Sequence, residues 1–263
     1  MVIDFHVHAF NPKIAKKAID ALALCCKTDP LTDGLITTTC QRMDEWGVDK
    51  ACLLSIATKP SQQRLITDWA AELDRDRFYP FMSLHPDADN WEEELSYALS
   101  KGLVGLKLHP DYQGFFVDDE KYDAFFDAVE KTGIPVVIHS GFDPVSPKVT
   151  HCDPERARRL IERHRHMKLV LAHLGGNFMY QQVLDTLAGI DGEVYFDTAY
   201  AKACDDDMLA RIIDKHGADR ILFASDCPWD SPKDTLEKLE RLDISDDKME
   251  LILCKNALRL LER

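Results

Sequence analysis

Short apolar stretches alternate with amphipathic stretches along most of the chain. Eight of the apolar stretches are almost continuously hydrophobic and rich in β-branched residues, which is typical of strands buried on both faces. They cover residues 2–8, 51–56, 79–84, 103–109, 134–140, 168–174, 194–198 and 221–226. Helical spacing marks the stretches between them, for example 92–101, 121–131, 154–164, 206–216 and 233–242. The pattern therefore predicts a series of βα units.

Eight such units predict a (β/α)8 barrel, an α/β fold known as the TIM barrel, in a single domain over residues 1–263. The alternation also fits an open, doubly wound sheet. The polar residues favour the barrel, because His8, His109, His139, His173 and Asp226 lie at or near the ends of five different strands. A closed barrel brings these ends to one mouth, whereas the edge strands of an open sheet lie far apart.

Two further expectations concern the segments outside this core. The connection after the first strand runs to residue 48 and contains two candidate helices, 13–26 and 35–46, which we expect to form a helical lid over the mouth. His164, His166 and His216 fall on or near helix ends, and we expect them at the surface.

Charge and composition narrow the possible partners. A formal net charge of −14 disfavours binding to phosphate backbones and anionic membranes, so we expect neither as a partner. The sequence starts without the basic and apolar segments of a secretory signal, and its eight cysteines form no CxxC pair. We therefore expect a cytoplasmic protein with free thiols that acts on a small molecule. Whether it forms a homodimer stays open.

His6 and His8 are the first candidates for chemistry. Residues two apart in a strand share a face, so this HxH pattern places two imidazoles side by side. Imidazoles beside a carboxylate suit Zn²⁺ and also accept Mn²⁺ or Fe²⁺. Asp4 has the same parity and is a candidate supporting partner. His139 and His173 each precede a glycine by two residues, which permits a sharp turn next to a ligand.

These motifs, in this order, resemble the amidohydrolase superfamily. The closer resemblance is to the branch called amidohydrolase 2, which includes relatives of aminocarboxymuconate-semialdehyde decarboxylase. It is carried by HVH at 6–8, GLKLHP at 105–110, His139, His173, SDCPW at 225–229 and NALRLL at 256–261. The resemblance covers essentially the whole chain.

The resemblance implies an enzyme with one divalent metal ion, most readily Zn²⁺. Its ligands would be His6, His8, His139 and Asp226. The same resemblance implies catalytic roles for two residues. Asp226 would take the proton from a metal-activated water, and His173 would orient or polarise the substrate.

Lys107, His109 and Trp229 are the candidate substrate-binding residues. In binuclear relatives a lysine on the fourth strand is carbamylated and bridges two metals. The alternatives for Lys107 are a cation that binds a substrate carboxylate, which we favour, and an ion pair with Asp4. His109 fits a structural role as well as contact with substrate.

The resulting hypothesis is a metal-dependent hydrolase that acts on an amide, ester or lactone through a metal-activated water. The alternative enzyme is a non-oxidative decarboxylase of an aromatic or unsaturated carboxylic acid, which would use the same metal site. A third reading, from another class, is a non-catalytic barrel that binds a metal or ligand. The sequence does not discriminate between the two reactions.

Overall fold

The computed structural model describes residues 1–262. It contains eight parallel strands that pair in sequence order, as the hydrophobic pattern predicts. The strands are β1 (Ile3–Val7), β2 (Lys50–Leu53), β3 (Phe78–Met82), β4 (Gly105–Leu108), β5 (Val136–Ile138), β6 (Leu169–Leu171), β7 (Val194–Asp197) and β8 (Ile221–Leu222). Backbone hydrogen bonds from Phe5 to Phe223 (2.8 Å) and from His8 to Cys227 (2.7 Å) join the first strand to the last. The predicted (β/α)8 barrel is therefore confirmed.

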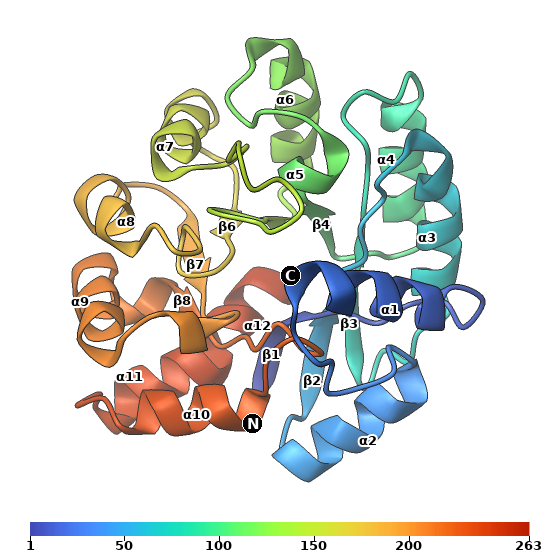
Figure 1. Cartoon of the computed structure of the whole chain (residues 1–263). Helices are drawn as coiled ribbons and strands as arrows, with labels where there is room; N and C mark the ends of the chain where they lie inside the picture. The colour runs from blue at the N-terminus through green and yellow to red at the C-terminus, as the bar shows by residue number, and fades with distance from the viewer. Residues whose placement is uncertain (263) are drawn as a thin grey trace.

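Helices surround the strands on the outside (Figure 1). They are α1 (Ala15–Cys26), α2 (Ile36–Trp46), α3 (Gln63–Ala71), α4 (Trp91–Ser100), α5 (Pro110–Gln113), α6 (Asp123–Thr132), α7 (Pro154–Arg163), α8 (Tyr180–Thr186), α9 (Asp206–His216), α10 (Pro232–Glu240), α11 (Asp246–Glu250) and α12 (Asn256–Leu261). Short helical turns lie at η1 (Pro60–Gln62), η2 (Glu120–Tyr122), η3 (Ala201–Ala203), η4 (Ala218–Arg220) and η5 (Leu251–Lys255). Over residues 1–262, none of these helices has the length and apolar character needed to span a membrane.

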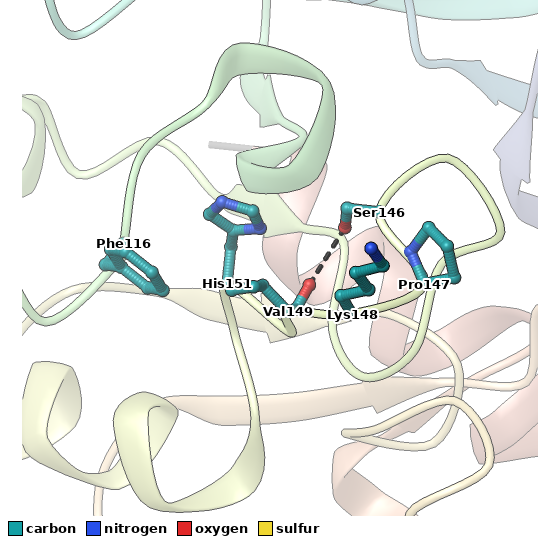
Figure 2. A pocket seen from close by; sticks show the side chains of 6 residues that line it. All are labelled: Phe116, Ser146, Pro147, Lys148, Val149 and His151. Atoms are coloured by element: carbon teal, nitrogen blue, oxygen red, sulfur yellow. Dashed lines mark hydrogen bonds between the residues drawn. The ribbon is translucent and has the colours of Figure 1, made fainter.

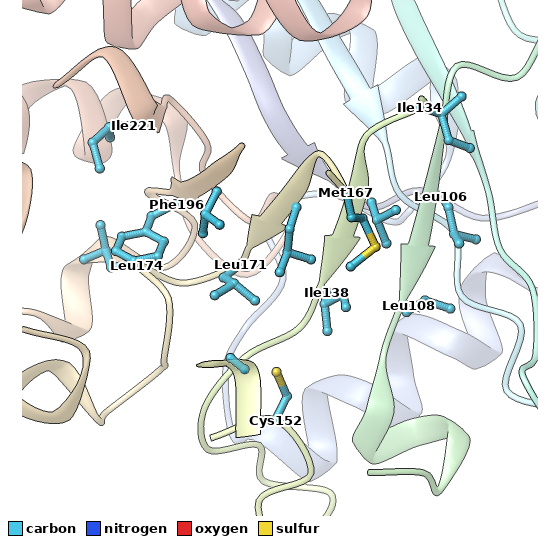
Figure 3. Close-up of a cluster of buried hydrophobic side chains, with 14 of the residues drawn as sticks. Leu106, Leu108, Ile134, Ile138, Cys152, Met167, Leu171, Leu174, Phe196 and Ile221 are labelled. Carbon is cyan, nitrogen blue, oxygen red and sulfur yellow. The ribbon is translucent and has the colours of Figure 1, made fainter. Parts of the chain in front are cut away.

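Two groups of buried apolar side chains hold the barrel and its helices together. The larger one includes outward-facing residues of the strands, and Figure 3 shows Leu108, Ile138 and Leu171 of β4, β5 and β6 within it. The smaller one joins strand residues such as Phe5 to Leu260 of α12. Removing this apolar surface from water stabilises the fold by about 25 cal/mol per Å².

Helix α10 shows why Asp226 is available to the site. Ser231 precedes the helix and its side chain accepts a hydrogen bond from the backbone N–H of Asp234, while Pro232 occupies the first helical position. The helix start therefore does not need Asp226 as a cap.

The connection after β1 forms both expected helices, α1 and α2. Its middle is attached to the loop after β8, because the N–H of Leu31 donates to the carbonyl of Pro228 at 2.9 Å. Its function as a lid stays a prediction.

The expectation of surface histidines is wrong for two of the three. His166 is exposed, but His164 and His216 are buried. The ring of His216 stacks on Phe196, and its Nε2 lies 3.0 Å from the carbonyl oxygen of Val194. The helical pattern identified these positions, but it did not show that Phe126 of α6 packs against His164 or that Phe196 of β7 packs against His216.

We expect His216 to make the fold sensitive to acid. Burial lowers its pKa from 6.5 to about 3, so the folded protein stays unprotonated there while the unfolded chain takes up a proton. The free energy of unfolding should therefore fall as pH drops from 6.5 towards 3, by up to about 1.4 kcal/mol per pH unit from this residue. Denaturant unfolding over that window should show a shallower slope for His216→Gln. The matched change at an exposed position, His166→Gln, should leave the slope unchanged, and equal slopes in all three proteins would contradict the assignment.

Candidate metal centre

The barrel brings the predicted chemical groups to the carboxyl ends of its strands. His8, His109 and His139 come directly after β1, β4 and β5, and His173 and Asp226 follow β6 and β8. All but His8 are buried, and the side chain of His8 is 12% exposed. Five strands therefore contribute side chains to the same barrel mouth, as the sequence predicts.

Three of the four predicted metal ligands converge there. His6 Nε2 lies 3.1 Å from His8 Nε2. Asp226 Oδ1 lies 3.2 Å from His8 Nε2 and 3.6 Å from His6 Nε2. The three side chains thus offer two nitrogens and one oxygen to a single point between them.

Hydrogen bonds on the far side of each ring determine which nitrogen carries the proton. His6 Nδ1 lies 2.8 Å from a carboxylate oxygen of Asp197, and His8 Nδ1 lies 2.7 Å from the carbonyl oxygen of Leu54. These oxygens accept hydrogen bonds, so both Nδ1 atoms are assigned as the donors and both Nε2 atoms carry lone pairs. Burial lowers the pKa of His6 well below its ordinary value, with a further contribution from Lys107, which keeps this ring neutral.

The residues therefore fit a divalent cation. Two unprotonated imidazole nitrogens and a carboxylate oxygen face one another, and acceptors at such distances repel unless positive charge lies near them. Two neutral imidazoles with a carboxylate are a donor set that suits Zn²⁺ and accepts Mn²⁺. Lys107 supplies one cationic neighbour, with Nζ 3.1 Å from His6 Nε2.

Lys107 is fully buried on β4. Burial lowers its pKa from 10.5 to about 8, although the charges of Asp197 and Asp226 oppose the shift. Asp4 has other partners: its oxygens accept from the backbone N–H (3.0 Å) and hydroxyl (2.5 Å) of Ser225. The side chain of Asp4 thus links β1 to Ser225, the residue before Asp226. Substrate binding by Lys107 stays a prediction.

Asp197, at the end of β7, is a site residue that the sequence analysis missed. It is fully buried, and its Oδ1 accepts from the backbone N–H of His173 (2.8 Å) and Ala199 (3.1 Å), while Oδ2 accepts from His6. One carboxylate therefore orients both a predicted ligand and a predicted catalytic residue. The available signal was an aspartate that ends a buried strand, the same signal that identified Asp226.

His139 and His173 form a second imidazole pair. His173 Nδ1 lies 3.1 Å from the carbonyl oxygen of Ala199, and its Nε2 lies 3.0 Å from His139 Nδ1. Within residues 1–262, His139 does not belong to the group of ligand atoms, all within 4.8 Å, that His6, His8 and Asp226 form. Its place as fourth ligand of the same ion stays a prediction.

Backbone geometry also singles out this mouth. Asp226 has φ 74°, and His173 and Leu174 each have φ 58°, a left-handed conformation that is rare for residues other than glycine. Gly141, two residues after His139, has φ 89°, and a Cβ there would come within 2.0 Å of the backbone nitrogen of Asn177. The glycine is therefore required where the loops after β5 and β6 meet.

The remaining substrate-binding candidates lie around these groups. The ring of His109 stacks between Tyr112 (centroids 3.6 Å apart) and His139 (4.0 Å). Trp229 is partly buried, and its backbone N–H donates to the carbonyl of Asp226 at 2.8 Å. Contact of either residue with substrate stays a prediction.

A hollow of about 440 Å³ lies beside the loop after β5 (Figure 2). It is lined by Phe116, Ser146, Pro147, Lys148, Val149 and His151. Figure 2 shows Phe116 and His151 close together, with their ring centroids 4.7 Å apart. His151 Nδ1 lies 2.8 Å from Asp111 Oδ1, and Asp111 directly precedes Tyr112, the residue stacked on His109.

The geometry agrees with a family assignment. The family model described as Amidohydrolase matches residues 3–263. The chain belongs to the amidohydrolase family. It is thus an enzyme of that superfamily, as the sequence motifs predicted. No curated protein matches the chain.

Several solved structures have the same fold as this amidohydrolase. A 2,6-dihydroxybenzoate decarboxylase from Rhizobium is 20% identical with a TM-score of 0.75, covering 99% of this chain and 98% of that one. A dihydroxybenzoic acid decarboxylase from Polaromonas sp. JS666, with bound manganese and an inhibitor, is 18% identical with a TM-score of 0.75, over 99% and 96% of the two chains. A probable 2-pyrone-4,6-dicarboxylic acid hydrolase from Acinetobacter baumannii is 16% identical with a TM-score of 0.71, over 100% and 99%. At these identities the likeness shows the fold alone.

We expect Asp197→Asn to weaken metal binding in this amidohydrolase. The amide oxygen would keep the place of Oδ1, which accepts two backbone N–H groups, so the amide nitrogen would face His6 Nδ1. His6 would then carry its proton on Nε2, where the ion should bind, and affinity for Zn²⁺ should fall by roughly 10- to 100-fold. Calorimetric titration of metal-stripped protein measures this. Asp191→Asn, at an exposed position, is the control, and equal affinities would show that Asp197 does not orient the ligand.

Proposed function

We propose that this amidohydrolase is a metal-dependent hydrolase of a small organic substrate, such as an amide, ester or lactone. The observation that supports it best is the convergence of the Nε2 atoms of His6 and His8 on the carboxylate of Asp226. We propose that these three side chains hold one divalent cation, Zn²⁺ or Mn²⁺. The manganese in the Polaromonas structure is consistent with the wider choice of metal.

When bound, a divalent cation at this point would supply Lewis-acid activation of a water molecule and of the substrate carbonyl. Asp226 directs Oδ1 towards the two imidazoles, which leaves Oδ2 to accept the proton of the attacking water. His173 lies beside His6, with ring centroids 5.3 Å apart, and the hydrogen bond to Ala199 fixes its ring. We propose that His173 orients the substrate against the cation.

Non-oxidative decarboxylation is the second candidate reaction. The same three side chains would serve it, and two of the similar solved structures are decarboxylases of dihydroxybenzoates. Hydrolysis differs in that it requires a base for water, which Asp226 supplies. The two reactions give different products, so the choice between them is experimental.

A substrate panel with the Zn²⁺- and Mn²⁺-loaded protein tests the proposal. We expect hydrolysis of at least one lactone, aryl ester or amide, measured by product chromatography, and no release of carbon dioxide from hydroxybenzoates. Release of carbon dioxide without any hydrolysis would replace the proposal by the decarboxylase.

The Asp226→Asn variant provides the internal check on that panel. Loss of a general base lowers turnover by roughly 10²- to 10⁴-fold, and the bound metal is measured alongside so that lost metal and lost base are separated. Asp234→Asn makes the same chemical change at an exposed position of α10 and should keep full activity. Hydrolysis that survives in Asp226→Asn would contradict the role given to this residue.

A further inference from the structure

The hollow beside the loop after β5 differs in charge from the chain as a whole. Lys148 and His151 are the basic residues of its lining and no acidic residue lines it, whereas the chain has a formal net charge of −14. Figure 2 shows His151 on one side of the view and Lys148 on the other. The volume of about 440 Å³ lies in the range of small-molecule sites, about 300–1,000 Å³. The hollow therefore has the size and the charge to hold a small anion.

A buried carboxylate fixes the ring of His151. The side chain of Asp111 is 0% exposed, and its Oδ1 lies 2.8 Å from His151 Nδ1 and also accepts the hydroxyl of Ser146. Because a carboxylate oxygen accepts, His151 Nδ1 is the donor. Within residues 1–262 the other ring nitrogen, Nε2, has no hydrogen-bond partner. The imidazole that lines the hollow thus keeps one nitrogen for a ligand.

Lys148 supplies the positive charge of the hollow. An imidazolium at His151 and the carboxylate of Asp111 would together carry no net charge, so this pair contributes direction more than attraction. Lys148 is exposed, and in the described part of the chain it forms no ion pair. A bound anion would be attracted by the Lys148 ammonium and would accept a charge-assisted hydrogen bond from His151 Nε2.

The rest of the lining is largely apolar and partly open to solvent. Val149 is 46% exposed, and the ring of Phe116 lies at 25° to that of His151, with centroids 4.7 Å apart. The guanidinium of Arg156 lies 4.3 Å from the centroid of Phe116 and is itself paired with Asp118 at 2.6 Å. This contact helps to fix the Phe116 ring as a flat wall. An apolar ligand would cover the exposed surface of this wall.

We propose that this hollow binds a small aromatic carboxylate, at a site separate from the proposed metal centre. The carboxylate would accept hydrogen bonds from His151 Nε2 and Lys148 Nζ, and the aromatic ring would lie against Phe116 and Val149. None of the lining side chains belongs to the group of His6, His8 and Asp226. A carboxylate on an apolar body matches both parts of the lining, whereas inorganic phosphate would leave the apolar part in water.

A residue-resolved NMR titration of the full, metal-stripped chain with benzoate tests the proposal. Removing the metal prevents the carboxylate from binding to an ion in the barrel mouth. We expect saturable shifts of the backbone N–H signals of Lys148, Val149 and His151. Benzamide has nearly the same shape without the charge, and we expect it to bind roughly tenfold more weakly, because hydrogen bonds to charged groups are the stronger ones. Inorganic phosphate should also bind more weakly than benzoate.

Two variants test the basic residues separately. Lys148→Met removes the charge from an exposed side chain and should weaken benzoate binding by up to about fivefold, since exposed ion pairs contribute little. His151→Gln should weaken it by roughly tenfold or more, because the charge-assisted hydrogen bond is lost. Lys131→Met and His166→Gln make the same changes at exposed positions outside the hollow and should leave the affinity unchanged.

Several results would overturn the proposed site. They are benzoate shifts confined to the barrel mouth, no shifts at all, equal affinities for benzoate and benzamide, or unchanged affinity in both variants. The NMR spectrum of each variant shows whether it is folded, and the exposed position of Lys148 keeps the test valid if His151→Gln does not fold. Since no metal is present in these titrations, such results leave the proposed metal-dependent hydrolysis standing.

Discussion

The hydrogen bonds that His6 and His8 donate from Nδ1 control what the barrel mouth can bind. Asp197 accepts one and the carbonyl of Leu54 accepts the other, so both Nε2 atoms carry lone pairs beside Asp226, with Lys107 Nζ as the one cationic neighbour of His6 Nε2. A buried cluster of acceptors is unfavourable unless a cation joins it. The proposed preference for metal would thus originate behind the rings, in groups that would not touch the ion.

Closure of the barrel is what makes this arrangement possible. Strand β8 is short, and the chain after it pairs with β1 through hydrogen bonds from Asp226 to His6 (2.9 Å) and from His8 to Cys227. The same backbone contacts that close the sheet therefore place Asp226 against the two imidazoles. Ser225, held by Asp4, reinforces this position.

Sequence was sufficient for the fold and for most of the site, for identifiable reasons. Continuous apolar strands and helical spacing give all eight βα units, and polar residues after strands mark the mouth because strand ends converge in a barrel. Asp197 was overlooked although it ends a strand in the same way as Asp226. The sequence pattern did not predict the burial of His216, because helical spacing does not show which neighbours cover a helix end.

The most direct test of this account is the tautomer of the histidines in the metal-free protein. Long-range ¹H–¹⁵N correlation spectra distinguish a ring protonated at Nδ1 from one protonated at Nε2, and His6→Gln and His8→Gln assign the signals. We expect the ring of His6 to be neutral and the rings of both His6 and His8 to carry a proton on Nδ1. A proton on Nε2 of either ring would contradict this expectation.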